Sequence, residues 1–94
     1  MEKDGAVYFP DAPTERGVKH VRELCECLRD GYEAFLLFVV QMEHVRFFSP
    51  NDATDPAFGE ALRRAEKEGV RLLAAECCVT PDTMILQREI PIFL

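Results

Sequence analysis

Three side chains able to bind phosphate follow one another near the start of an expected helix. Arg16, Lys19 and His20 lie three and four residues apart, so on a helix they project from one face. Thr14 is suited to begin that helix, because its hydroxyl can accept a hydrogen bond from a free backbone N–H. A helix start attracts anions, and added cations strengthen the attraction. One interpretation is therefore a phosphate-binding face, and the alternative is a solvated face on which nearby glutamates pair with the cations.

Asp11 is the candidate metal ligand next to this face. It follows a proline at the end of an expected strand, where a carboxylate either reaches a magnesium ion or caps the next helix. No Ser or Cys lies in a nucleophile turn, and the five glycines are isolated rather than grouped in a phosphate loop. The residues themselves therefore indicate no catalytic group, and they disfavour a hydrolase or a nucleotide-binding protein.

The four cysteines occur as two close pairs, Cys25 with Cys27 and Cys77 with Cys78. Neither pair has the two-residue gap that is typical of zinc and redox motifs. Free cysteine is among the most buried residue types. We therefore expect buried, reduced thiols and no zinc site.

The elements that must position these residues begin with a strand and a helix. Residues 5–9 are β-prone and are followed by a proline, which predicts a short strand entering a loop. A helix then runs from the Thr14 cap to a stop at Asp30-Gly31. The continuously apolar segment 33–41 predicts a strand covered on both faces, at the centre of a sheet.

The second half of the chain continues the alternation. A loop is expected at 49–53, and Asp55-Pro56 supply the cap and the first-turn proline of a second helix that ends at Gly69. Two further strands, 70–79 and 84–90, read as an antiparallel pair. The order β-α-β-α-β-β predicts an α/β domain with a mixed, mostly parallel sheet and flanking helices.

Composition limits the chain to one domain, residues 1–94, of ordinary globular type, with 48% hydrophobic and 30% charged residues. No apolar run approaches the length of roughly 20 residues that a spanning helix needs, and no signal-peptide pattern opens the chain, so we expect a cytoplasmic protein. The net charge of -6 opposes attraction to nucleic acid over the whole surface. Any DNA binding would need a local basic patch.

Residues 9–24 carry a resemblance to a known family. They read Phe-Pro-Asp-Ala-x-Thr-x-Arg-Gly-x-Lys-His-x-x-Glu-Leu, which resembles the signature of the sugar fermentation stimulation family. Further matches follow in family order over essentially the whole chain: Ala34 to Gln41, Phe48 to Asn51, Asp55-Pro56, Gly69-Val70 and Ile90-Pro91.

The resemblance implies a fold and a function. Family members are described as DNA-binding, one is implicated in expression of maltose-metabolism genes, and their C-terminal domain resembles the PD-(D/E)xK, restriction-endonuclease-like nucleases. Residues 1–94 would be that domain, truncated at its N-terminal side and lacking the family's N-terminal OB-like domain. The partner implied is double-stranded DNA, with Arg16, Lys19, His20 and Thr14 at the phosphates.

One departure from the family concerns the Glu-x-Lys strand that precedes the Phe-Pro-Asp-Ala segment. The chain has no acidic residue two positions before a lysine, since Lys3, Lys19 and Lys67 follow Met1, Gly17 and Ala65 at that distance. Magnesium nucleases need several carboxylates and a lysine or its equivalent. We therefore expect no catalysis by this chain alone.

The alternative is part of a magnesium-dependent nuclease. Asp11 would then be the local metal ligand, and a missing region or a partner chain would supply the Glu-x-Lys strand. In either case an incomplete sheet exposes an edge, which we expect a second copy or the missing N-terminal segment to cover.

Overall fold

The computed structural model describes residues 2–94 and confirms the predicted mixed α/β class, with flanking helices. All six predicted elements are present, and two short strands, β1 and β4, are added to them. The elements are β1 (Glu2–Lys3), β2 (Ala6–Phe9), α1 (Glu15–Arg29), β3 (Phe35–Val40), β4 (Phe47–Pro50), α2 (Pro56–Glu68), β5 (Arg71–Val79) and β6 (Met84–Ile90).

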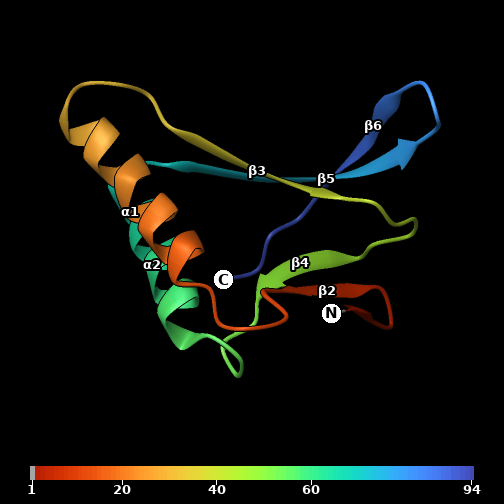
Figure 1. The fold of residues 1–94 in the computed structure, drawn as a ribbon, viewed down its shortest axis with the longest axis horizontal. Helices are drawn as coiled ribbons and strands as arrows, with labels where there is room; N and C mark the ends of the chain where they lie inside the picture. The colour runs from red at the N-terminus through yellow and green to blue at the C-terminus, as the bar shows by residue number, and fades with distance from the viewer. Residues whose placement is uncertain (1) are drawn as a thin grey trace.

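The strands form two three-stranded sheets, which lie on opposite sides of the molecule (Figure 1). In one sheet β2 lies between β1, antiparallel to it, and β4, parallel to it. In the other sheet β5 lies between β3, parallel to it, and β6, antiparallel to it. Both helices lie at one end of the sheets, and the chain crosses after β6 to reach β4 (Figure 1). There Ile92 pairs with Phe48 in parallel fashion.

Strand β4 occupies part of the segment expected to be a loop, since Ser49 and Pro50 continue the strand. The reason is tertiary, because β4 has partners on both sides. Its residues pair with β2, and Phe48 also bonds the C-terminal segment, accepting from Phe93 N at 2.8 Å and donating to Pro91 O at 2.9 Å. No local sequence pattern predicts those strand partners.

Strand β3 does not lie at the centre of its sheet, where it was predicted. It lies at the edge of its sheet, and β5 takes the centre. Its side chains alternate, so that Phe35, Leu37 and Val39 are 50%, 45% and 42% exposed while Val40 is buried. The prediction of a central strand covered on both faces was wrong, because a run of apolar residues does not reveal which neighbours a strand has.

The helix boundaries agree with the sequence. Thr14 caps α1 by accepting a hydrogen bond from Gly17 N at 3.0 Å, and Gly69 ends α2 at a φ of 112°, a conformation that favours glycine. The inner sides of both helices pack with the inner side of β3 and β5 in one apolar cluster, which includes Val21, Phe58 and Leu62. A second cluster fills the space between the two sheets.

The two helix starts are joined by one buried carboxylate. Asp55 is only 7% exposed, and its two oxygens accept hydrogen bonds from Phe58 N at 3.1 Å and from Thr14 N at 2.9 Å. Buried Asn51 reinforces the junction, since its backbone N donates to Phe9 O at 2.8 Å and its side chain to Pro10 O at 3.2 Å. The loop after β2 and the loop after β4 are therefore held against each other.

A second buried carboxylate holds the β5–β6 hairpin against the loop before β4. Glu76 Oε1 accepts from Arg88 Nη2 at 2.6 Å and from Val45 N at 2.7 Å, and Arg88 also donates to the Val45 carbonyl. The hydrogen bond from Arg88, and then that from the Val45 N–H, lower the pKa of Glu76 below its usual 4.5. The charged form is therefore the one the fold stabilises.

We predict that Asp55→Ala lowers the free energy of unfolding by about 2–3 kcal/mol, because it leaves two buried N–H groups without an acceptor. Urea denaturation at neutral pH measures the change. Asp82→Ala, at an exposed position in the turn after β5, is the matched control and should change stability by less than about 0.5 kcal/mol. Equal effects of the two substitutions would show that the junction is not stabilising.

We predict that Glu76→Gln makes the urea midpoint less dependent on acid. Since the folded pKa of Glu76 is lowered, its stabilisation is fully present above 4.5 and is lost as the pH falls through the lower folded value. Midpoints measured at about pH 7 and about pH 3 should differ less in the variant than in the parent chain. Glu89→Gln, at an exposed position on β6, is the control and should behave like the parent.

Candidate functional site

Three of the four predicted phosphate ligands lie on the solvent side of α1. Arg16, Lys19 and His20 are all exposed. Lys19 Nζ lies 4.0 Å from Glu23 Oε1, and the two side chains are 80% and 54% exposed, so the ion pair contributes little. The cations therefore stay accessible to a ligand, although the glutamate pairing foreseen for a solvated face also occurs.

Thr14 stabilises the start of α1. Its hydroxyl accepts from Gly17 N and its own N donates to Asp55, so both groups are already engaged. Gly17 is packed closely, since a Cβ there would lie 2.9 Å from the Thr14 side chain and 3.1 Å from the Phe58 ring. That glycine is explained by contact with α2.

Asp11 is exposed in the loop between β2 and α1. Among residues 2–94 no group of three or more His, Cys, Asp or Glu side chains is placed to hold a metal ion. Divalent magnesium is bound through several oxygen ligands, so the residues described do not by themselves form a site for it. The assignment of Asp11 as a metal ligand stays a prediction.

The cysteines are free, as expected, but they are not all buried. Cys25 and Cys77 are buried, Cys78 is half-buried and Cys27 is exposed. Burial, followed by a hydrogen bond to Glu68, raises the pKa of the Cys25 thiol. Cys25 is therefore held as a neutral thiol between the two helices.

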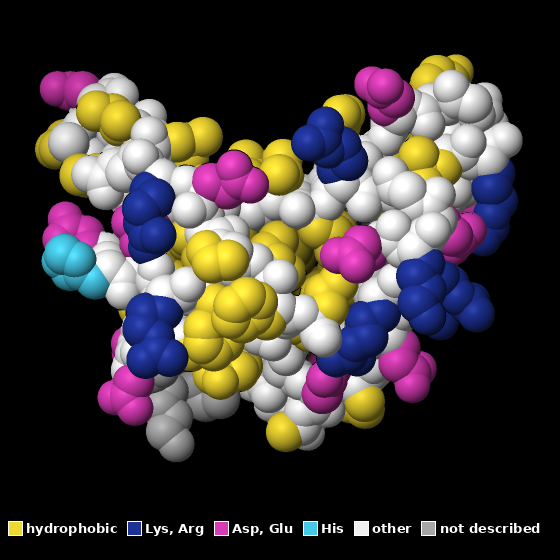
Figure 2. Space-filling model, turned by 180° about the vertical axis from the view of Figure 1, so that it is seen from behind, with side chains coloured by type: hydrophobic (Ala, Val, Ile, Leu, Met, Phe, Trp, Pro, Cys, Tyr) yellow, Lys and Arg dark blue, Asp and Glu magenta, His cyan; other side chains and the backbone are white. Residues whose placement is uncertain are grey.

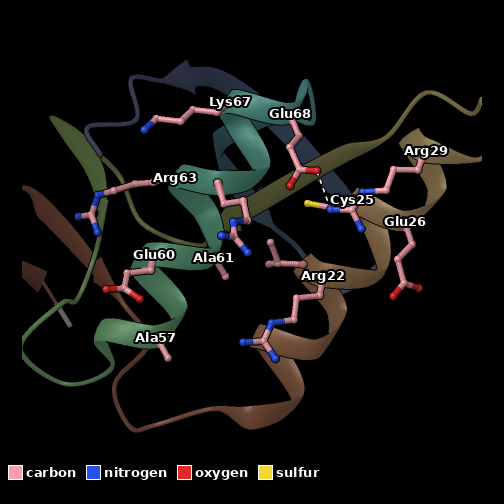
Figure 3. Close-up of a pocket in the computed structure, with 12 residues that line it drawn as sticks. Arg22, Cys25, Glu26, Arg29, Ala57, Glu60, Ala61, Arg63, Lys67 and Glu68 are labelled. Carbon is pink, nitrogen blue, oxygen red and sulfur yellow. Dashed lines mark hydrogen bonds and ion pairs between the residues drawn. The ribbon is translucent and has the colours of Figure 1, made fainter.

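Two adjoining hollows follow the line where α1 and α2 meet. The larger, of about 930 Å³, is shown in Figure 3. The smaller, of about 370 Å³, lies at the helix starts and includes Thr14, Lys19 and Asp55. Arg22 and Ala57 line both hollows. The larger is lined by Val21, Arg22, Cys25, Glu26, Arg29, Ala57, Glu60, Ala61, Arg63, Arg64, Lys67 and Glu68, which we call the interhelical groove.

The interhelical groove is locally basic. It holds five of the eleven Lys and Arg residues of the chain but only three of the seventeen acidic ones. One cation is engaged across the groove, where Arg29 Nη2 donates to Glu68 Oε1 at 2.7 Å and lowers the pKa of Glu68 (Figure 3). Arg63 is engaged outside it, since its Nη2 lies 2.5 Å from Asp52 Oδ2. In a chain of net negative charge, this groove is a local attractor for anions.

Two arginines remain available in the groove. Arg22 of α1 and Arg64 of α2 are exposed and make no ion pair within the part of the chain that the structure describes. Figure 3 shows Arg22 reaching toward α2, whereas Arg63 and Lys67 extend from the side of α2 that faces away from α1. Two guanidinium groups from neighbouring helices therefore flank one hollow.

This groove was not predicted from the sequence. Arg22 follows Lys19 at the same helical spacing that linked Lys19 to Arg16, so the row of cations continues into the groove. On α2 the signal is a pair of alanines, Ala57 and Ala61, at i and i+4, with Arg64 three residues later. Small side chains at that spacing leave room beside a neighbouring helix, and a cation on the same side then faces the space.

A different surface appears from behind, where hydrophobic side chains gather in the middle of the molecule (Figure 2). Aromatic contacts tie β2, β4 and the C-terminal segment together: Tyr8 and Phe47 lie 6.1 Å apart edge to face, and Phe47 and Phe93 stack at 4.9 Å. Phe93 is nevertheless 56% exposed. The middle of this face is therefore apolar, with Lys and Arg side chains around it (Figure 2).

Neither helix of residues 2–94 has the length and apolar character to cross a membrane.

The comparisons with known proteins agree with the predicted family. A family model described as the sugar fermentation stimulation protein RE domain matches residues 1–83. That description fits the restriction-endonuclease-like class expected from the resemblance.

Sugar fermentation stimulation protein homologs from three bacteria illustrate the similarity. That of Desulfitobacterium hafniense (strain DSM 10664 / DCB-2) is 51% identical over 84 residues, which cover 89% of this chain and 37% of the homolog. Those of Clostridium perfringens (strain 13 / Type A) and Clostridium beijerinckii are 50% and 45% identical over 94 residues, which cover all of this chain and 41% and 42% of the homologs. The chain thus spans about two fifths of these relatives' length.

A solved structure shares the fold. The structure of Pyrococcus furiosus SfsA in complex with Ca2+ superposes with a TM-score of 0.88 at 27% sequence identity, and the match covers all of this chain and 41% of that one. With the family model matching most of the chain, the fold and the relatives lead to one assignment: the chain belongs to the sugar fermentation stimulation protein family.

Proposed function

We propose that this chain is a DNA-binding module of a sugar fermentation stimulation protein, with a role in regulating sugar-metabolism genes. The observation that carries the proposal is the row of exposed cations on α1. Arg16, Lys19 and His20 stand on the first half of that helix, and Lys19 also lines the smaller hollow at the helix starts. Phosphate contacts of this kind position a protein on duplex DNA without reading its sequence.

The two helix starts lie next to each other beside these side chains. The hydrogen bond from Thr14 N to Asp55 brings the beginning of α1 next to the beginning of α2. The backbone N–H groups of Gly17 and Phe58 already donate to Thr14 and Asp55, and the Asp55 carboxylate lies at both positive helix ends. The attraction for a phosphate therefore depends on the side chains of α1.

We predict that a fluorescein-labelled duplex of about 20 base pairs binds this chain more weakly as KCl rises from about 50 to about 200 mM. Reversing two charges, in Arg16→Glu with Lys19→Glu, should lower the affinity by about tenfold or more and reduce the salt dependence. Fluorescence anisotropy measures both effects.

The matched control reverses two exposed arginines outside the helices, Arg46→Glu with Arg71→Glu, and makes the same change in net charge. It should retain most of the affinity, since it leaves α1 intact. Absence of binding at the lower salt, or equal losses in the two double variants, would refute the proposed DNA contact.

A magnesium-dependent nuclease part is the second candidate. It is favoured by one observation, that the similar Pyrococcus furiosus structure is described as a complex with Ca2+. Asp11 would contribute one oxygen ligand, and the remaining carboxylates and a lysine would come from outside the described residues. The chain therefore needs another region or chain to complete such a site.

This second candidate predicts that the chain alone does not cleave plasmid DNA with magnesium, and that a version extended upstream of residue 1 does. Asp11→Asn in the extended version should lower the cleavage rate, and Asp82→Asn should not. Agarose gel electrophoresis of supercoiled plasmid follows the reaction. Cleavage that survives Asp11→Asn undiminished would remove Asp11 from the metal site.

A further inference from the structure

We infer that the interhelical groove, which adjoins the proposed DNA-contacting residues, binds a small phosphate monoester that also carries hydroxyl groups. Arg22 and Arg64 flank the groove from the two helices and have no ion-pair partner within residues 2–94. Guanidinium groups bind phosphate oxygens through paired N–H donors, which fix a phosphate more firmly than a single charge does. Two of them on one hollow suit a dianionic phosphate.

Small side chains between the arginines leave room for a ligand in the groove. Between the arginines the lining includes the buried, neutral thiol of Cys25 of α1, half-buried Ala61 and exposed Ala57 of α2. Because these side chains are small, the hollow has a volume of about 930 Å³, which is within the range of small-molecule sites. A phosphate held by the two arginines would therefore leave room for the rest of its molecule.

The carboxylates of the groove limit which chemical class of ligand can bind there. Glu26 of α1 and Glu60 of α2 line the rims of the same hollow, on the outer sides of the two helices (Figure 3). They would repel a continuous chain of phosphates lying along the groove, but they can accept hydrogen bonds from hydroxyl groups. A molecule with one phosphate and several hydroxyl groups satisfies both kinds of lining residue, and an extended polyanion does not.

The width of the groove is fixed from within the fold. At one end Arg29 and Glu68 join the two helices at 2.7 Å, as the dashed line in Figure 3 shows. At the other end Asp55 joins the two helix starts. The two helices that carry the arginines are thus held together at both ends of the groove. Less conformational entropy is therefore lost when a ligand binds.

The test is isothermal titration of the 94-residue chain with glucose 6-phosphate, inorganic phosphate and glucose as probes. Glucose 6-phosphate should bind saturably, and more tightly than either of the other two. Arg22→Ala and Arg64→Ala should each weaken that binding by about tenfold or more. Arg46→Ala, at an exposed arginine outside the helices and the groove, should not.

Other outcomes overturn the inference. Equal affinity for glucose 6-phosphate and inorganic phosphate would mean adventitious anion binding only. Binding that neither groove variant weakens would place the ligand elsewhere. A duplex-DNA affinity that falls with Arg64→Ala but not with the Arg16/Lys19 reversal would make the groove a nucleic-acid surface instead. Since all three substituted arginines are exposed, the folded state of each variant can be checked by circular dichroism.

Discussion

The carboxylate of Asp55 is the contact on which the arrangement of the helices depends. One buried side chain caps α2 and at the same time binds the residue that caps α1, so the two helices start from a common point. The loops that meet there contain the Phe-Pro-Asp-Ala segment and the Asn-Asp-x-x-Asp-Pro segment, the most recognisable parts of the sequence. Much of what looks like a functional signature is therefore the means of joining two helices.

That junction also organises the charge. An acidic chain can present a basic site only where its few cations are brought together and its acids are turned elsewhere. Pairing α1 with α2 brings the cations of both helices to one hollow. Arg29 engages Glu68 there, which leaves Glu26 and Glu60 as the other acidic residues of the lining. The row on α1 continues from Arg16 and Lys19 to Arg22, which lines both hollows. The electrostatic character of this domain is thus a product of helix packing.

Local signals in the sequence were sufficient for the helices and the terminal hairpin. Caps such as Thr14 and Asp55 and the stop at Gly69 act over a few residues, and the structure confirms them. The edge position of β3 and the strand character of Ser49-Pro50 depend on partners far along the chain, so no local pattern could reveal them. The groove was missed for the same reason, since Arg22 and Arg64 become neighbours only when the helices pack.

The β5–β6 hairpin is divided by an irregularity in pairing between Glu76 and Cys77. On the side of the core, Ala74 and Ile90 are buried. On the side of the turn, Met84, Ile85 and Leu86 are exposed, although their partner strand still buries Cys77. The tip can therefore open without disturbing the base, as a locally unfolding unit. A peptide tag inserted into the turn at Pro81-Asp82 would therefore lengthen an exposed turn and leave the packing of the two helices unchanged.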